Sequence, residues 1–300
     1  MSIQEEKTKR PWIVFIGLSK VAQPKSMADL HPNWASGCIV GDSHILTAAH
    51  VCKNLDLARR IQKLGGRTVS LVCIPGFRGT FTNTTKVYTI QDDAFAVSKH
   101  CLHSAIQFRE ITQYAKALKK VEHQSFYSND LGMYFLDSKL PAEIPRARVH
   151  AETDSYLAPS AKNPLMAHGY PMHEKGRLVF ANTHCTKAFP AKFAMHDAML
   201  KEGASGGPLW RLSSRNPTVI GVVSGVDQVN LGGPMRGYGR DSKTGEFGEV
   251  IVNEETFEMT LLENLDPKPP EPKVVTAGIA SRINGQSLLE IKKWLERRPQ

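Results

Sequence analysis

Residues 202–209 read Glu-Gly-Ala-Ser-Gly-Gly-Pro-Leu, which places a serine in a glycine-dense turn directly before an apolar strand. Glycine permits tight backbone turns that other residues rarely adopt. Such a turn can project the Ser205 hydroxyl and aim neighbouring backbone N–H groups at one point, as a nucleophile and an oxyanion site require. The candidate donors are the amides of Gly203 and Ser205. Taken alone, the stretch is also compatible with a Gly-Ser-rich hairpin turn.

A histidine follows another short apolar strand. Residues 45–50 read Ile-Leu-Thr-Ala-Ala-His, so the imidazole of His50 is expected at a strand end, where it can face a cleft. With an ordinary pKa of about 6.5, histidine can accept a proton from a hydroxyl and return it to a leaving amine. His50 is therefore the candidate general base for Ser205.

Two carboxylates are candidates for the residue that orients His50. Asp130 opens the strongly apolar residues 131–136, where burial of its side chain is expected. An isolated buried carboxylate is costly, but one that accepts the imidazole N–H fixes the histidine tautomer and stabilises the imidazolium. Asp93 also precedes an apolar run, at residues 94–97. The stronger apolar strand favours Asp130, and Asp93 is the alternative.

In this chain order, the three segments resemble the His, Asp and Ser motifs of the trypsin/chymotrypsin-like serine peptidase family. Other proteins with the same three residue types run Asp, His, Ser or Ser, Asp, His. Residues 169–171, Gly-Tyr-Pro, are similar to a motif frequent in bacterial members. Weaker similarities extend over most of the chain, at residues 11–14, 36–40, 122–126, 221–225 and 278–283.

The resemblance implies an all-β, chymotrypsin-like fold of two packed six-stranded β-barrels, with inserted helices and a C-terminal helix. Residues 1–145 would form the barrel that carries His50 and Asp130, and residues 146–300 the barrel that carries Ser205. The implied activity is that of a serine endopeptidase, which hydrolyses peptide bonds through an acyl-enzyme and needs no cofactor. The alternatives are a catalytically latent, protease-like binding module and an esterase on the same fold.

Two positions depart from the family pattern. Ala204 replaces the aspartate that pairs with a newly cleaved N-terminus in zymogen members, and Val51 stands where many members carry a cysteine. Matching backwards from Ser205 puts Met199 and Leu200 at the base of the substrate pocket. Its walls would be formed by Ser224, Gly225, Val226, Ala277 and Gly278. Because none of these residues is charged, we expect a preference for small or medium apolar side chains.

Short β-rich runs separated by Gly, Pro, Asn and Asp fit an all-β architecture. They lie at residues 12–17, 37–40, 45–47, 68–74, 86–90, 131–136, 165–169, 178–181, 208–211, 219–223 and 274–279. Apolar residues at helical spacing predict helices at residues 54–64, 104–121 and 286–298. Residues 227–273 are rich in Gly, Asp and Glu and end in prolines. We expect a mobile surface loop there. This loop is the candidate gate of the active site, and a regulatory protein is a possible partner.

The composition is that of an ordinary packed protein. The 300 residues are 41% hydrophobic and 22% charged. The net charge of +9 is spread along the chain, so nucleic-acid binding is not expected and the partner should be a protein or peptide substrate.

No apolar run reaches membrane-spanning length and no signal peptide is evident, which predicts a cytoplasmic protein unless it is exported without a signal. The odd number of cysteines, five, predicts reduced thiols, and the isolated His100-Cys101-Leu102-His103 cluster predicts no metal site.

Overall fold

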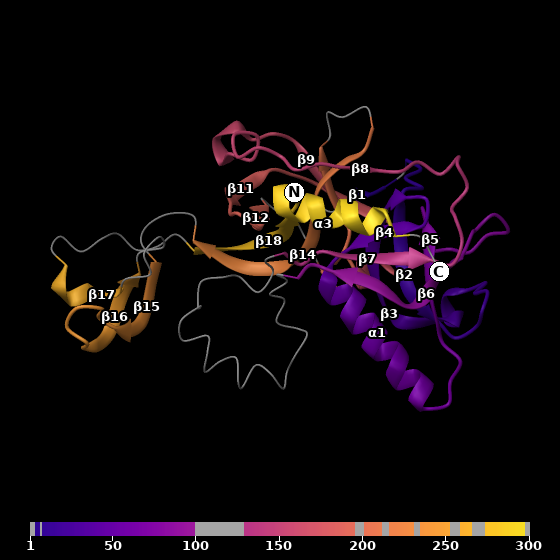
Figure 1. The fold of residues 1–300 in the computed structure, drawn as a ribbon, viewed down its shortest axis with the longest axis horizontal. Coiled ribbons are helices and arrows are strands. Elements are labelled where there is room, and N and C mark those ends of the chain that lie inside the picture. Colours follow the sequence, from indigo (N-terminus) through magenta and orange to yellow (C-terminus); the bar gives the residue numbers. More distant parts are fainter. Residues whose placement is uncertain are drawn as a thin grey trace. The chain divides into compact units, whose positions relative to one another are not determined.

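The computed structural model describes residues 4–6, 8–99, 129–195, 201–211, 216–230, 235–252, 259–265 and 274–297. The chain divides into two compact units, one formed by Met1–Val226 with Gly278–Gln300 and the other by Asp227–Ala277. Figure 1 traces both along the sequence. No helix in the described part of the chain is both long enough and apolar enough to span a membrane.

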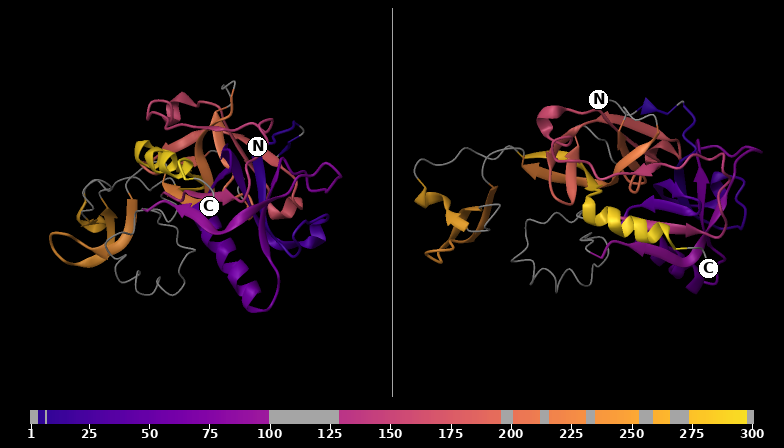
Figure 2. Two further views of the ribbon diagram at one scale, coloured as in Figure 1. Left: turned by 45° about the vertical axis from the view of Figure 1, so that its right-hand side comes forward. Right: turned by 45° about the horizontal axis from the view of Figure 1, so that its top comes forward.

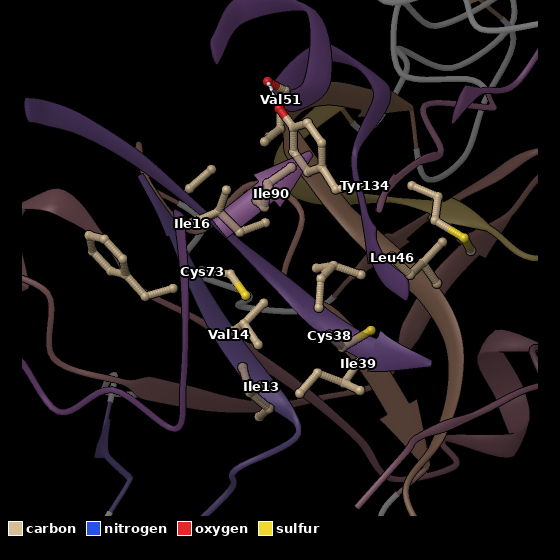
Figure 3. Packing of buried hydrophobic residues seen from close by; sticks show 14 of the residues in the cluster. Ile13, Val14, Ile16, Cys38, Ile39, Leu46, Val51, Cys73, Ile90 and Tyr134 are labelled. Atoms are coloured by element: carbon tan, nitrogen blue, oxygen red, sulfur yellow. Dashed lines mark hydrogen bonds between the residues drawn. The ribbon is translucent and has the colours of Figure 1, made fainter. Parts of the chain in front are cut away.

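The first half of the larger unit is a closed, antiparallel barrel of six strands. In order around the barrel these are β2 (Ile13–Ser19), β3 (Leu30–Gly41), β4 (His44–Thr47), β7 (Gly132–Leu136), β6 (Tyr88–Val97) and β5 (Ser70–Pro75). Every residue of β2 and β7 is buried, because these strands contribute to the barrel interior and are covered on the outside as well. Figure 3 shows the resulting core, in which Ile13, Val14, Ile39 and Leu46 lie together.

The second half of the larger unit is a nine-stranded sheet. Its strands are β1 (Gln4–Glu5), β8 (Arg148–Val149), β9 (Leu165–Gly169), β10 (Val179–Thr183), β11 (Cys185–Ala188), β12 (Lys192–Met195), β13 (Pro208–Arg211), β14 (Thr218–Asn230) and β18 (Val274–Arg282). The predicted all-β class is confirmed. The sheet has nine strands where six were predicted. Two of the additional strands, the very short β1 and β8, pair with β10 and β14 and leave no periodic signal in the sequence.

Among the described residues, two α-helices accompany the strands, and both overlap predicted ones. α1 (Ala49–Leu64) begins directly after β4 and projects from the barrel (Figure 2). Tyr134 of β7 donates from its hydroxyl to the carbonyls of Val51 and Cys52, at 3.3 and 3.2 Å, which ties the first turn of α1 to the barrel core. The predicted helix at residues 104–121 lies outside the described residues.

The C-terminal helix α3 (Gly285–Leu295) is held by a reciprocal cap. The Asn284 side chain accepts from the Ser287 amide at 2.9 Å, and the Ser287 hydroxyl accepts from the Asn284 amide at 2.8 Å. This arrangement satisfies backbone donors that the first helical turn leaves open. Short 3₁₀ turns occur at Met27–Asp29, Pro159–Ala161, Met172–Glu174 and Leu262–Asn264.

The prediction of a mobile loop at residues 227–273 is wrong for the parts that the structure describes. They form an antiparallel three-stranded sheet of β15 (Met235–Arg240), β16 (Phe247–Val252) and β17 (Met259–Leu261). The high content of Gly, Asp and Glu masked the strand pattern of β16 and β17 in the sequence. Val250 of β16 and Leu261 of β17 are buried. The role of this segment as a gate stays a prediction.

The Asp241 carboxylate organises this small sheet. It accepts hydrogen bonds from the amides of Lys243, Thr244 and Leu261, each at 2.8 Å, so it closes the β15–β16 turn and attaches β17. These backbone hydrogen bonds, foremost that from Thr244, hold the pKa of Asp241 below its ordinary value. The stabilisation is therefore present above the ordinary carboxyl pKa and is lost as the pH falls through the lowered one.

We expect Asp241→Ala to accelerate amide hydrogen exchange across β15, β16 and β17 at neutral pH, since three backbone donors lose their acceptor. The nearby Glu246→Ala removes an exposed carboxylate and is the matched control, with exchange as in the wild type. Exchange measured by mass spectrometry separates the two. Equal exchange in both variants would mean that the Asp241 contacts do not hold the sheet.

The four described cysteines, Cys38, Cys52, Cys73 and Cys185, are buried and form no disulfide, which agrees with the prediction of reduced thiols for these positions. Burial raises the pKa of Cys185 to about 11 and raises the pKa of Cys38 and Cys73 further. These three thiols are protonated and unreactive at neutral pH. Cys101 lies outside the described residues.

Candidate active site

The ends of two neighbouring strands bring His50 and Asp130 together. β4 pairs with β7 in a register that sets Thr47 opposite Gly132. The chain continues from β4 into the first turn of α1, which carries His50, while Asp130 lies just before β7. Gly132 permits the close approach of α1, because a Cβ there would lie 2.8 Å from Cys52 Sγ.

Asp130 contacts His50 at two points. Its Oδ2 lies 2.7 Å from His50 Nδ1, and its Oδ1 accepts a hydrogen bond from the His50 backbone amide at 2.9 Å. Asp130 is fully buried, and His50 is 9% exposed. A carboxylate that holds Nδ1–H leaves Nε2 of the neutral imidazole as a proton acceptor. The pair is thus arranged as an oriented general base.

The other candidate carboxylate, Asp93, is described only by its backbone. Asp93 belongs to β6, and its side chain is outside the described residues. Its neighbour Asp92 forms ion pairs with Arg59 and Lys63 of α1, on the flank of the barrel. Of the two candidates, Asp130 is the one that the structure brings to His50.

A serine of the second sheet contacts Asp130, and a second serine contacts the first. The Ser281 hydroxyl, on β18, accepts from the Asp130 amide at 2.9 Å and lies 3.0 Å from the Ser224 hydroxyl on β14. Both serines are buried. The sequence analysis missed Ser281 in this role and predicted Ser224 only as a pocket wall. Nothing in the local sequence signals a contact between residues so far apart.

The loop of residues 202–207 has the backbone expected of an oxyanion site. Gly203 and Gly206 take φ values of +91° and +86°, in the left-handed region that favours glycine. The amide of Ala204 donates to Lys201, and that of Gly206 to Val223. Within the described part of the chain, the amides of Gly203 and Ser205 donate no hydrogen bond, so both predicted donors are available to an oxyanion.

Ser36 fastens this loop to the barrel. Its amide donates to the Ser205 carbonyl at 2.9 Å, and its hydroxyl donates to the Gly203 carbonyl at 2.7 Å. The same hydroxyl accepts from the Tyr170 amide at 2.8 Å. Ser36 is fully buried, so these bonds are shielded from water. Ser36 lies in a stretch, residues 36–40, that resembles the peptidase family, but its contact with the loop was not predicted from the sequence.

Close packing also brings Ser205 to the strand end that leads to His50. A Cβ at Gly206 would lie 2.0 Å from Thr47 Oγ1 and 3.2 Å from the Ala48 amide. Ser205 is half-buried. Among the described residues its hydroxyl makes no hydrogen bond with His50. Hydrogen bonds between catalytic groups are often long in unliganded sites and shorten when substrate binds.

The predicted substrate pocket is only partly described. Ser224 is buried, Gly225 is half-buried and Val226 is 42% exposed. Gly278 pairs with Met195 of β12, and Ala277 is buried. Met199 and Leu200, the predicted base, lie outside the described residues, so the primary specificity stays a prediction.

No group of three or more His, Cys, Asp or Glu side chains within the described ranges could hold a metal ion. His100, Cys101 and His103 lie outside those ranges.

A scan against protein-family models finds no match, and a search of curated protein sequences also finds none. Solved structures do match. A Glu endopeptidase in complex with MPD is 11% identical, with a TM-score of 0.55, over 98% of this chain and 97% of that one. An inactivated protease paralogue from the scabies mite is 13% identical, with a TM-score of 0.51, over 98% and 99% of the two chains.

The chain has the chymotrypsin fold. This confirms the resemblance to the trypsin/chymotrypsin-like serine peptidases at the level of architecture. The chymotrypsin fold by itself does not decide whether a chain is catalytic, since one of the two similar structures is an inactivated paralogue.

Proposed function

We propose that this chain is a serine endopeptidase. Ser205 attacks the scissile carbonyl, His50 takes the hydroxyl proton and returns it to the leaving amine, and Asp130 orients the imidazole. The Gly203 and Ser205 amides bind the oxyanion of the tetrahedral intermediate. Residues 1–145 supply His50 and Asp130, and residues 146–300 supply the nucleophile and its loop.

The observation that carries the proposal is the two-point contact of buried Asp130 with His50. Burying a carboxylate is expensive, and a merely structural aspartate needs no imidazole as its partner. An inactive binding module would have no reason to retain this pair beside a loop with two unused amides. The preferred substrates have a small or medium apolar side chain before the cleaved bond, in contrast to the structurally similar Glu endopeptidase.

A fluorophosphonate probe tests the proposal directly. We expect one covalent adduct by intact mass, mapped to Ser205 by peptide sequencing, because such probes react with activated serines. Ser205→Ala should give no adduct, and heat-unfolded wild type should give none either. No adduct on the folded wild type would contradict the proposal and favour a binding module. Labelling together with cleavage of esters but not of peptides would favour an esterase.

A further inference from the structure

A buried polar network outside the candidate active site attaches the N-terminal segment to the second sheet. β1 pairs with β10, and the Glu6 amide donates to the Leu178 carbonyl at 3.0 Å. The Glu6 side chain, 5% exposed, lies 2.9 Å from Nε2 of the fully buried His168 side chain. His168 Nδ1 in turn accepts from the indole N–H of Trp210 at 3.1 Å.

The donors and acceptors of this network allow one protonation state. Trp210 can only donate, so His168 Nδ1 must carry a lone pair and the ring must be neutral, with its proton on Nε2. Nε2–H then donates to the Glu6 carboxylate. Burial lowers the pKa of His168, which agrees with a neutral ring. Burial alone would raise the pKa of Glu6, but the hydrogen bonds from His168 and the Thr8 amide lower it to about 2.

Two further contacts complete the attachment. The Thr8 amide donates to Glu6 Oε1 at 2.7 Å, and Arg10 Nε donates to Glu6 Oε2 at 3.3 Å. The Arg10 guanidinium also lies over the Trp210 ring, 5.4 Å from its centroid. Residues 4–6 and 8–10 are thus held by the pairing of β1 with β10 and by one ionised, almost fully buried carboxylate. Loss of that carboxylate leaves its buried hydrogen-bond donors unsatisfied, which weakens the attachment.

The attached strands are those that frame the loop of residues 202–207. His168 is the last residue but one of β9, which pairs with β13. Trp210 is part of β13, which follows the loop directly. A Cβ at Gly207 would lie 1.9 Å from the His168 carbonyl, and one at Gly169 would lie 2.8 Å from Ala204 Cα. The loop therefore rests on the backbone next to His168.

The residues that follow β9 also contact the loop of residues 202–207. The Met172 amide donates to the Glu202 carbonyl at 2.7 Å. Ala204 is buried but offers no polar side chain with which the loop could be anchored from within. Besides its own turn hydrogen bonds, the loop is held by outside contacts to Ser36 on the barrel side, and to Val223 and residues 168–172 on the sheet side.

We propose that residues 4–10 form a tether that holds the loop of residues 202–207 in its oxyanion-binding shape, with Glu6 and His168 as positioning residues. The inference rests on the proposed function and adds a dependence of that function on the N-terminal segment. When Glu6 releases His168, the end of β9 loosens and the Gly203 and Ser205 amides no longer converge. Only the tethered fraction of molecules then reacts.

Glu6→Ala is the main test, and Glu5→Ala is its matched control, because Glu5 is the exposed neighbour of Glu6 and has the same side chain. Two quantities are measured well below the melting temperature: the rate of fluorophosphonate labelling of Ser205, and amide hydrogen exchange over residues 201–211. We expect Glu6→Ala to label at least about tenfold more slowly, by analogy with the loss of oxyanion donors. Exchange over residues 201–211 should rise while that of β7 stays unchanged.

Glu5→Ala should match the wild type in both measurements, and Glu6→Gln, whose amide oxygen still accepts from His168, should recover part of the rate. If Glu6→Ala does not fold, Arg10→Ala removes a weaker contact of the same carboxylate and should shift both quantities in the same direction. A lowered melting temperature with wild-type labelling and wild-type exchange would show that the network only stabilises the fold, and would overturn the tether. Should the wild type itself fail to label, the proposed activity fails, and the exchange measurement alone decides on the tether.

Discussion

Asp130→Asn is expected to lower kcat/KM on a peptide substrate by about ten-thousandfold, while the protein stays folded. Asp130 receives hydrogen bonds on both oxygens, from Nδ1–H and from the backbone amide of His50. Asparagine has only one acceptor oxygen. If that oxygen takes the backbone amide, its NH₂ group faces Nδ1 and forces the imidazole proton onto Nε2. The ring then cannot accept the proton of Ser205.

The control for this experiment is Asp93→Asn, because Asp93 is the other carboxylate that the sequence offers. We expect it to change turnover by no more than a few fold. Melting curves of both variants establish that loss of activity is not loss of folding. A large loss in Asp93→Asn with a small one in Asp130→Asn would reverse the assignment of the carboxylate.

The sequence predicted the strands well because each is a short apolar run bounded by turn residues. That signal is local, as at β2 and β7, where every position is buried. The predicted helix starts at residue 54, whereas α1 begins at Ala49. Residues 49–53, Ala-His-Val-Cys-Lys, have no helical periodicity of their own, and tertiary contacts from Tyr134 to the carbonyls of Val51 and Cys52 fix this first turn.

The site was predictable only in part. His50, Asp130 and Ser205 lie in motifs whose neighbours reveal them: an apolar strand end, a buried strand start and a glycine turn. Their supports carry no such local mark. Ser36 reaches Gly203 across 167 positions of the chain, and Ser281 reaches Asp130 across 151. A lone serine on a strand looks the same in the sequence whether it faces water or a catalytic loop.

Gly206→Ala is expected to destabilise the protein by about 3 kcal/mol or more and to abolish labelling of Ser205 at ordinary temperatures. An added Cβ would lie 2.0 Å from Thr47 Oγ1 and 2.1 Å from the Ser36 carbonyl. Neither group can yield freely, because Thr47 Oγ1 donates to that same carbonyl at 2.8 Å and both residues are fully buried. The loop must lift from the barrel to make room.

Two effects contribute to the expected loss: the left-handed backbone conformation and the clash of the added Cβ. The chain offers a control that separates them. Gly66 has a φ of +74°, close to the +86° of Gly206, but a Cβ there meets nothing within 4 Å. Gly66→Ala therefore carries the left-handed backbone cost, about 1–2 kcal/mol, without the clash. Denaturant unfolding of both variants measures the difference. Equal destabilisation would mean that the loop does not pack on Thr47 and Ser36; a much larger loss in Gly206→Ala, together with loss of labelling, would mean that this packing holds Ser205 beside His50.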